Sequence, residues 1–135
     1  MLYPNVSFPI TTGTIAAFLR ASLVSWSSLV VAPKRPATMP QRFLSIRDDG
    51  GTQDGLHMVN RYGVNVWADS AVDAENICRD AMADLRSLPG MGPFKSTRTF
   101  FGPVEVEDDP ALTFGTVPMS HFYFSFAAVL KGTQV

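Results

Sequence analysis

Residues 121–131 read HFYFSFAAVLK and show the strongest strand pattern in the sequence. Apolar residues alternate along this stretch, and Gly132 follows it. Because successive side chains of a strand point to opposite faces of a sheet, one face of this strand is expected to lie on a core. The residues of that face are Phe122, Phe124, Phe126, Ala128 and Leu130.

Two helices are expected upstream of this strand. Ser70 and Asp73 are typical of a capping box, and an apolar stripe then continues at helical spacing until Pro89-Gly90 ends the helix. That stripe consists of Ala74, Ile77, Cys78, Ala81, Leu85 and Leu88, so the Cys78 thiol should be buried and unreactive. The other helix begins near Thr12 or Thr14, either of which can cap it. Its stripe consists of Ile15, Phe18, Leu19 and Leu23.

Four further strands are expected, at residues 29–31, 42–47, 56–68 and 97–106. Residues 48–52, which read DDGGT, predict a hairpin turn between the second and third of these strands, because Asp and Gly accept the positive φ angles of such turns. Gly102-Pro103 predicts that the last of the four is bent, bulged or at an edge. Residues 105–118 then form a long acidic excursion.

These elements predict one α+β domain over residues 12–135. Its sheet should be mixed, mostly antiparallel and built of about five strands, with both helices packed on one face. Residues 1–11 are apolar but broken by Pro4 and Pro9, which predicts an extended N-terminal arm.

The composition narrows the classes of function. Apolar residues make up 46% of the chain and charged residues only 17%, which indicates that other chains cover part of its surface. A net charge of -1 argues against binding dominated by phosphate groups. The single cysteine excludes an internal disulfide and a cysteine-rich zinc site. No cofactor and no metal is expected.

Enzymatic motifs are not evident. The sequence has no G-x-S-x-G motif, and its two histidines are expected on strand faces opposite the most apolar residues. The carboxylates Asp48, Asp49 and Asp54 lack the spacing of an EF-hand. A small enzyme or ligand-binding domain stays open as an alternative, because one strand face carries several polar candidates. They are His57, Arg61, Asn65 and Trp67.

The succession of motifs over residues 42–132 resembles the tail terminator proteins of long-tailed, non-contractile bacteriophages. It begins with RFLSIR at 42–47 and YGVNVWA at 62–68. DSAVDAE at 69–75 then opens a helix that closes with LRSLPG at 85–90. Residues 102–104, the Asp109-Pro110 loop and an aromatic final strand complete the set. Residues 110–118 look like an insertion relative to that family.

The resemblance implies a structural virion protein without enzymatic activity or cofactor. Such proteins form a hexameric ring on the head-proximal end of the tail tube, stop tube elongation and provide the docking surface for the head–tail connector. The implied partners are further copies of the chain, the tail-tube protein and the connector proteins, with DNA passing through the lumen without specific binding and no membrane. The implied location is the tail or neck of the virion, assembled in the host bacterial cytoplasm. Another neck ring protein, such as a connector adaptor or stopper, or a tail-tube subunit stays open as an alternative.

Three regions are expected to make contacts in such a ring. The arm would reach a neighbour or the tube, and the hairpin tip would project toward an adjacent ring or the lumen. The acidic excursion would meet a ring or connector partner, with Phe114 as an apolar anchor. Two residues of the strand at 56–68 are also expected at an interface. The residues are Leu2, Tyr3, Val6 and Phe8; Asp48, Asp49 and Asp54; Glu105, Glu107, Asp108, Asp109 and Phe114; and Arg61 and Trp67.

Overall fold

The computed structural model of the chain describes residues 6–7, 11–54, 57–87, 97–131 and 133–134. The elements follow one another as β1 (Val6–Ser7), α1 (Thr12–Ser22), β2 (Leu29–Val31), β3 (Arg42–Asp54), β4 (His57–Ala68), α2 (Ala71–Arg86), β5 (Thr97–Val106), β6 (Thr113–Phe114), β7 (Val117–Pro118), β8 (Ser120–Lys131) and β9 (Thr133–Gln134).

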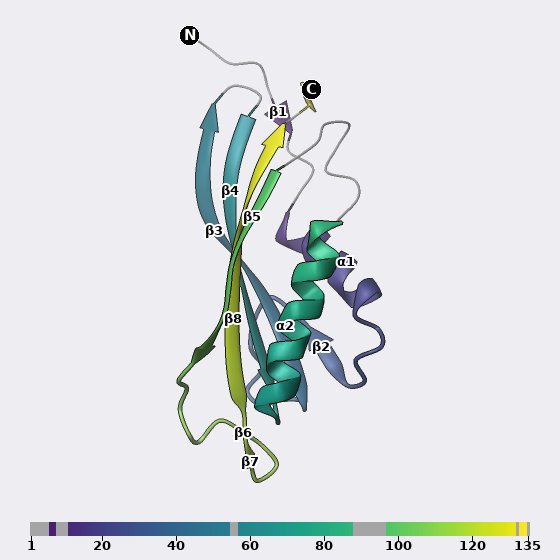
Figure 1. Cartoon of the computed structure of the whole chain (residues 1–135), viewed down its shortest axis with the longest axis vertical. Helices are drawn as coiled ribbons and strands as arrows, with labels where there is room; N and C mark the ends of the chain where they lie inside the picture. The colour runs from purple at the N-terminus through teal and green to yellow at the C-terminus, as the bar shows by residue number, and fades with distance from the viewer. Residues whose placement is uncertain (1–5, 8–10, 55–56, 88–96, 132, 135) are drawn as a thin grey trace.

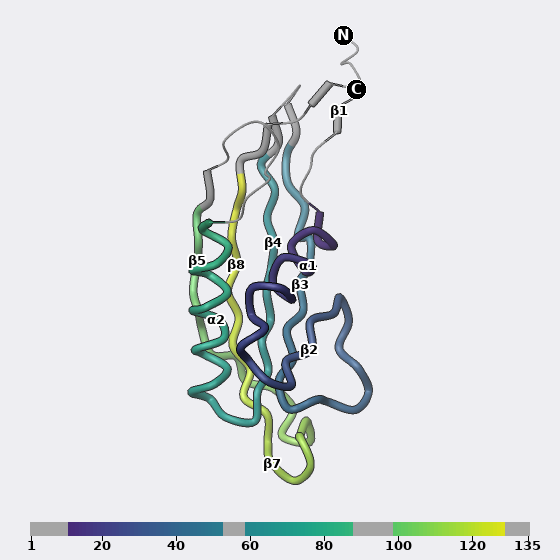
Figure 2. The backbone as a smooth tube through the Cα atoms, turned by 90° about the vertical axis from the view of Figure 1, so that its right-hand side faces the viewer, coloured from purple at the N-terminus to yellow at the C-terminus, as the bar shows by residue number. Residues whose placement is uncertain are grey.

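Five strands form the main sheet in the order β2-β3-β4-β8-β5. β2 runs parallel to β3, and the other neighbours are antiparallel. Both helices pack on the same face of this sheet, α1 against β3 and α2 across β4, β8 and β5 (Figures 1 and 2). The predicted α+β architecture is therefore confirmed.

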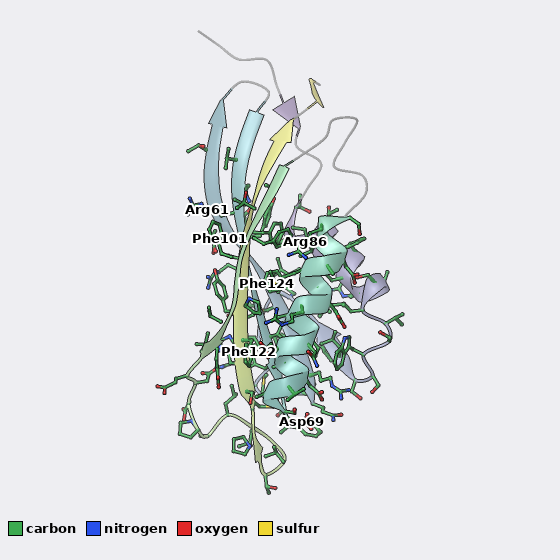
Figure 3. All side chains as sticks on the ribbon, viewed as in Figure 1. Arg61, Asp69, Arg86, Phe101, Phe122 and Phe124 are labelled. Atoms are coloured by element: carbon green, nitrogen blue, oxygen red, sulfur yellow. The ribbon has the colours of Figure 1, made fainter. Side chains whose placement is uncertain are left out.

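The core lies between the sheet and the helices. Alternation along β8 places Phe122, Phe124 (Figure 3) and Phe126 against α2. The predicted stripe of α2 is buried from Ala74 to Leu85, and Leu88 lies outside the described residues. The Ser70 hydroxyl caps α2 by accepting from the Asp73 N–H at 3.3 Å. Cys78 is fully buried in this layer, and burial raises the pKa of its thiol to about 12. No helix among the described residues is long and apolar enough to cross a membrane.

The cap of α1 differs from the prediction. Thr11, and not Thr12 or Thr14, is the N-cap, and its hydroxyl accepts from the Thr14 N–H at 3.2 Å. Ile15, Leu19 and Leu23 are buried as expected.

The predicted hairpin turn at residues 48–52 is wrong. β3 continues to Asp54, and a bulge at Asp49 absorbs the Asp-Asp-Gly-Gly stretch within the strand. Gly50 takes a φ of 81°, and its N–H donates to Asp48 Oδ1 at 2.7 Å. The positive φ and the aspartate hydrogen bond that are typical of a turn therefore occur within the bulge. Gly51 has no room for a side chain, because a Cβ there would lie 1.8 Å from the Val59 carbonyl oxygen.

The chain reversal after β3 falls at residues 55–56, outside the described residues, as does the side chain of Asp54. Asp48 and Asp49 therefore lie within the sheet and not at a tip. β5 is an edge strand whose register slips between Phe101 and Val104, which confirms the irregularity expected from Gly102-Pro103.

The described part of the arm pairs with the chain's own C-terminal segment. Val6 lies opposite Gln134 and Ser7 opposite Thr133, in a separate two-stranded sheet. Leu2, Tyr3 and Phe8 lie outside the described residues. Contact between the arm and a neighbouring chain stays a prediction.

Candidate functional site

The face of the main sheet that points away from α1 and α2 is here called the open face. It carries the aromatic, polar and exposed apolar side chains that make up the candidate site. Strand alternation brings residues from β3, β4, β8 and β5 onto it. This face divides into two parts. The covered half is built around Phe43, Trp67 and His121, and the bare half around Arg61, Phe101, Val104, Tyr123, Ser125 and Ala127.

The covered half is a small second core. Trp67 on β4 packs against Phe43 with ring centroids 5.6 Å apart, and stacks on His121 of β8 at 4.3 Å. Met39, which lies between β2 and β3, and Met119, which lies between β7 and β8, close over these rings. The chain thus uses two of its own connections to bury this half of the face.

The polar groups of the covered half are turned toward one another. Trp67 Nε1 donates to Asp108 Oδ2 at 2.8 Å, and His121 Nδ1 lies 3.0 Å from the same oxygen, although not in hydrogen-bond geometry. His121 Nε2 lies 2.7 Å from Asn65 Oδ1. The Asp108 side chain is only 24% exposed. Asp108 therefore fastens the excursion to the sheet, whereas we expected it to project toward a partner.

Charges around this cluster act in opposite directions. Burial lowers the pKa of His121, and the Asp108 carboxylate only partly offsets that effect. Burial alone would raise the pKa of Asp108, but the hydrogen bonds from Trp67 and from the Asp109 N–H, with the charges of His121 and Arg35, leave it lowered. The Arg35 guanidinium lies over the Trp67 ring, 5.9 Å from its centroid. Arg35 also disfavours protonation of His121.

A histidine beside an aspartate is also the base of a catalytic triad, so its geometry matters. In a triad the second ring nitrogen faces a nucleophile. Here that nitrogen, Nε2, faces the Asn65 amide, and the ring is buried. The arrangement is suited to holding the excursion in place and not to activating a nucleophile.

The bare half has the opposite character. Phe101 is 61% exposed and Val104 is 53% exposed, although both stand on an ordered strand. Arg61 is exposed beside them and has no carboxylate partner among the described residues. Figure 3 shows Arg61 and Phe101 on the side of the sheet away from the helices.

A shallow hollow of about 250 Å³ lies in the bare half. Its lining combines three aromatic residues, two hydroxyl groups, a guanidinium and a carboxylate. The lining residues are Asp49, Arg61, Phe101, Tyr123, Ser125, Phe126 and Ala127. Asp49 is already paired with Arg47, whose guanidinium lies over the Tyr123 ring. Arg61 is therefore the one charge of this lining that is left without an opposite charge in the described structure.

The rest of the excursion is exposed. Glu105 lies at the end of β5, and Glu107 and Asp109 follow it on the surface. Phe114, on the β6–β7 hairpin at the lower end of the sheet in Figure 1, is 38% exposed. Only Asp108 among the four predicted acidic residues turns inward to the open face.

The alternative polar set proposed from the sequence is split. Asn65 and Trp67 join the covered half, Arg61 lines the hollow, and the side chain of His57 lies outside the described residues. The partner that sequence reasoning missed is His121, which the β4–β8 register places directly opposite Trp67. Within the described ranges, no three His, Cys, Asp or Glu side chains gather as a metal site.

Comparison of the sequence with protein-family models finds no match, and comparison with curated proteins finds none, so the family suggested by the order of motifs enters below as a proposal.

Proposed function

We propose that this chain is a structural subunit of a phage tail that forms a hexameric ring on the head-proximal end of the tail tube. The observation that carries the proposal is the bare half of the open face. Phe101 and Val104 expose large apolar surfaces on the face of the sheet opposite the one that packs against both helices. Exposed apolar patches of this kind mark contacts with other proteins.

The fold supports the same proposal. A mixed sheet with two helices on one face is what the resemblance to tail terminators implies. The chain's own connecting segments cover one half of the open face, so only the other half is available to a neighbouring subunit. In a cyclic ring each contact joins two different patches of the subunit, so an uncovered sheet face on one side suits this symmetry.

The proposed role is to cap the tube. The ring would stop the addition of tube subunits and present its other side to the head–tail connector. DNA would pass through the lumen without specific binding, which agrees with the net charge of -1. The protein would act in the tail or neck of the virion and would have no enzymatic activity.

The test is the mass of the purified protein by light scattering, followed by electron microscopy with and without the tail-tube protein of the same phage. We expect closed rings of six subunits, or rings that appear on tube ends, and shorter tubes when this protein is added. Tubes that grow longer by incorporating it would make it a tube subunit instead. A monomer that leaves tube length unchanged would overturn the proposal.

The hollow beside Arg61 favours one other role, the binding of a small acidic ligand between Phe101 and Tyr123. A ligand that binds only the folded state raises the melting temperature. A monomeric protein whose melting temperature rises with small aromatic or aliphatic carboxylates would favour this role over the ring.

A further inference from the structure

Two exposed surfaces of this chain have complementary chemistry. The bare half of the open face combines apolar side chains with the unpaired cation of Arg61. Residues 107–117 of the acidic excursion combine exposed carboxylates with two exposed apolar side chains. We propose that the bare half of one copy binds the excursion of a second copy, with Glu107 facing Arg61. This inference rests on the proposed self-assembly of the chain.

The receiving surface combines the Arg61 cation with the exposed apolar side chains of Phe101 and Val104. Arg61 stands on β4 opposite Ala127, and Phe101 stands on β5 opposite Ser125. The hollow between them is open to solvent, and its one other charged residue, Asp49, is already paired with Arg47. A carboxylate arriving with apolar neighbours would pair with Arg61 while Phe101 and Val104 lose their exposed surface.

The inserting surface is held in shape before it binds. The Met119 N–H donates to the Leu112 carbonyl at 3.0 Å, and β6 pairs with β7, so the hairpin is closed. Asp108 ties its root to Trp67. The hairpin presents Phe114 at 38% and Val117 at 44% exposure. A segment that is ordered in advance loses less conformational entropy on binding.

The excursion cannot fill the bare half of its own chain. It leaves the sheet beside His121, whereas Arg61 lies opposite Ala127 on the same strand, six residues away. Six strand residues span about 20 Å, and the β6–β7 hairpin lies beyond the lower end of β8 (Figure 1). An excursion that binds the bare half must therefore come from another copy. Joining two different patches gives a head-to-tail contact, which closes into a ring when its rotation permits.

The experiment reverses each charge and then recombines them. Arg61→Glu and Glu107→Arg should each weaken self-association by about tenfold or more in Kd, because like charges then face each other. An equal mixture of the two variants should restore assembly, since each face of one variant meets the complementary excursion of the other. Glu105→Arg is the matched control. The sequence placed Glu105 among the expected contact residues, but its position opposite Phe122 puts it on the helix-facing side of β5, away from the open face. The proposed contact therefore leaves it out, and the self-association of this variant should match that of the original protein.

Circular dichroism of each variant checks that these surface changes leave the fold intact. Unchanged association of Arg61→Glu, or a mixture that stays dissociated, would overturn this contact while leaving ring formation standing. A protein that never associates, alone or on tube ends, would overturn both the contact and the proposed function. Equal weakening by Glu105→Arg would show a general charge effect and would also overturn the contact.

Discussion

The two halves of the open face are built from the same strands, but only one of them is covered by other segments of the chain. In the covered half, Met39, Leu112 and Met119 come from connections of the same chain and bury Trp67 and Phe43. In the bare half, Phe101 and Val104 stay exposed. The strand register is continuous between the two halves along β4 and β8.

The difference shows in the polar groups as well as in the apolar ones. Trp67, His121 and Asn65 direct their nitrogen and oxygen atoms at partners within the chain. Arg61 has no partner of opposite charge among the described residues. Buried polar groups need partners, whereas exposed ones have water. The polar groups of the covered half thus face atoms of the same subunit, although His121 Nδ1 makes no hydrogen bond, and the bare half is the surface that we propose for a second subunit.

The largest expected effect comes from emptying the covered half. Trp67→Ala removes a side chain that is only 7% exposed and leaves Asp108 without its indole donor. We expect a loss of about 3–5 kcal/mol in the free energy of unfolding. Urea denaturation of the dissociated subunit measures it. A loss below about 1 kcal/mol would mean that the second core contributes little and that the two halves are energetically alike.

Asp108→Asn tests the fastening of the excursion with a smaller change. The amide oxygen can still accept from Trp67, but the charge facing His121 is lost. We expect a loss of about 1–2 kcal/mol in the free energy of unfolding. Asp109→Asn is the control, because Asp109 accepts only from local N–H groups such as that of Ala111 and is exposed. Its effect should stay within about 0.5 kcal/mol. Equal losses in the two variants would contradict a specific role for Asp108.

The pH dependence of stability tests whether His121 is buried in the covered half as the structure shows. Unfolded His121 takes up a proton near its ordinary pKa of 6.5, whereas burial lowers the pKa in the folded state. The unfolded state therefore binds more protons as the pH falls below 6.5, and stability decreases with falling pH in that window. The lowered pKa of Asp108 acts in the same direction at pH values below 3.8.

Unfolding free energies at pH 7.5 and 5.5 measure this effect, and His121→Gln should reduce the difference between them. His57→Gln, which changes the other histidine, should retain the contribution from His121. The NMR titration of the His121 ring gives the folded-state pKa directly. A value above 6.5 would contradict the argument and would mean that the Asp108 carboxylate outweighs burial.

Local pattern predicted the elements because each is decided by neighbouring residues. The alternation of Phe122, Phe124 and Phe126 predicted β8, and Ser70 with the stripe through Ile77 predicted α2. The same reasoning failed at residues 48–52, where Asp-Gly chemistry typical of a turn forms a bulge within β3. β3 continues to pair with β4 beyond the bulge. This pairing depends on the residues of a different strand, so residues 48–52 alone could not predict it.

The candidate site was harder to predict from the sequence, because it depends on the register between two strands and on the return of the excursion over the sheet. Trp67 meets His121 only through the pairing of β4 with β8, and Asp108 reaches both only because the excursion returns over the sheet. The sequence did place Trp67 and Arg61 on the same polar face. It could not show that the chain buries one of them and leaves the other exposed.

The smallest effect on stability should come from the bare half. Phe101→Thr replaces one residue type suited to a strand with another and removes a ring that is 61% exposed, so the free energy of unfolding should change by less than about 0.5 kcal/mol. Its self-association should nevertheless weaken, because the removed surface is the part that a second copy would bury. Val24→Thr removes an apolar side chain that is 80% exposed beyond α1 and should change neither quantity. Light scattering and urea denaturation of both variants separate the two measurements. A Phe101→Thr protein that unfolds more easily but associates normally would place this ring in the subunit's own core, and the distinction between the two halves would then fail.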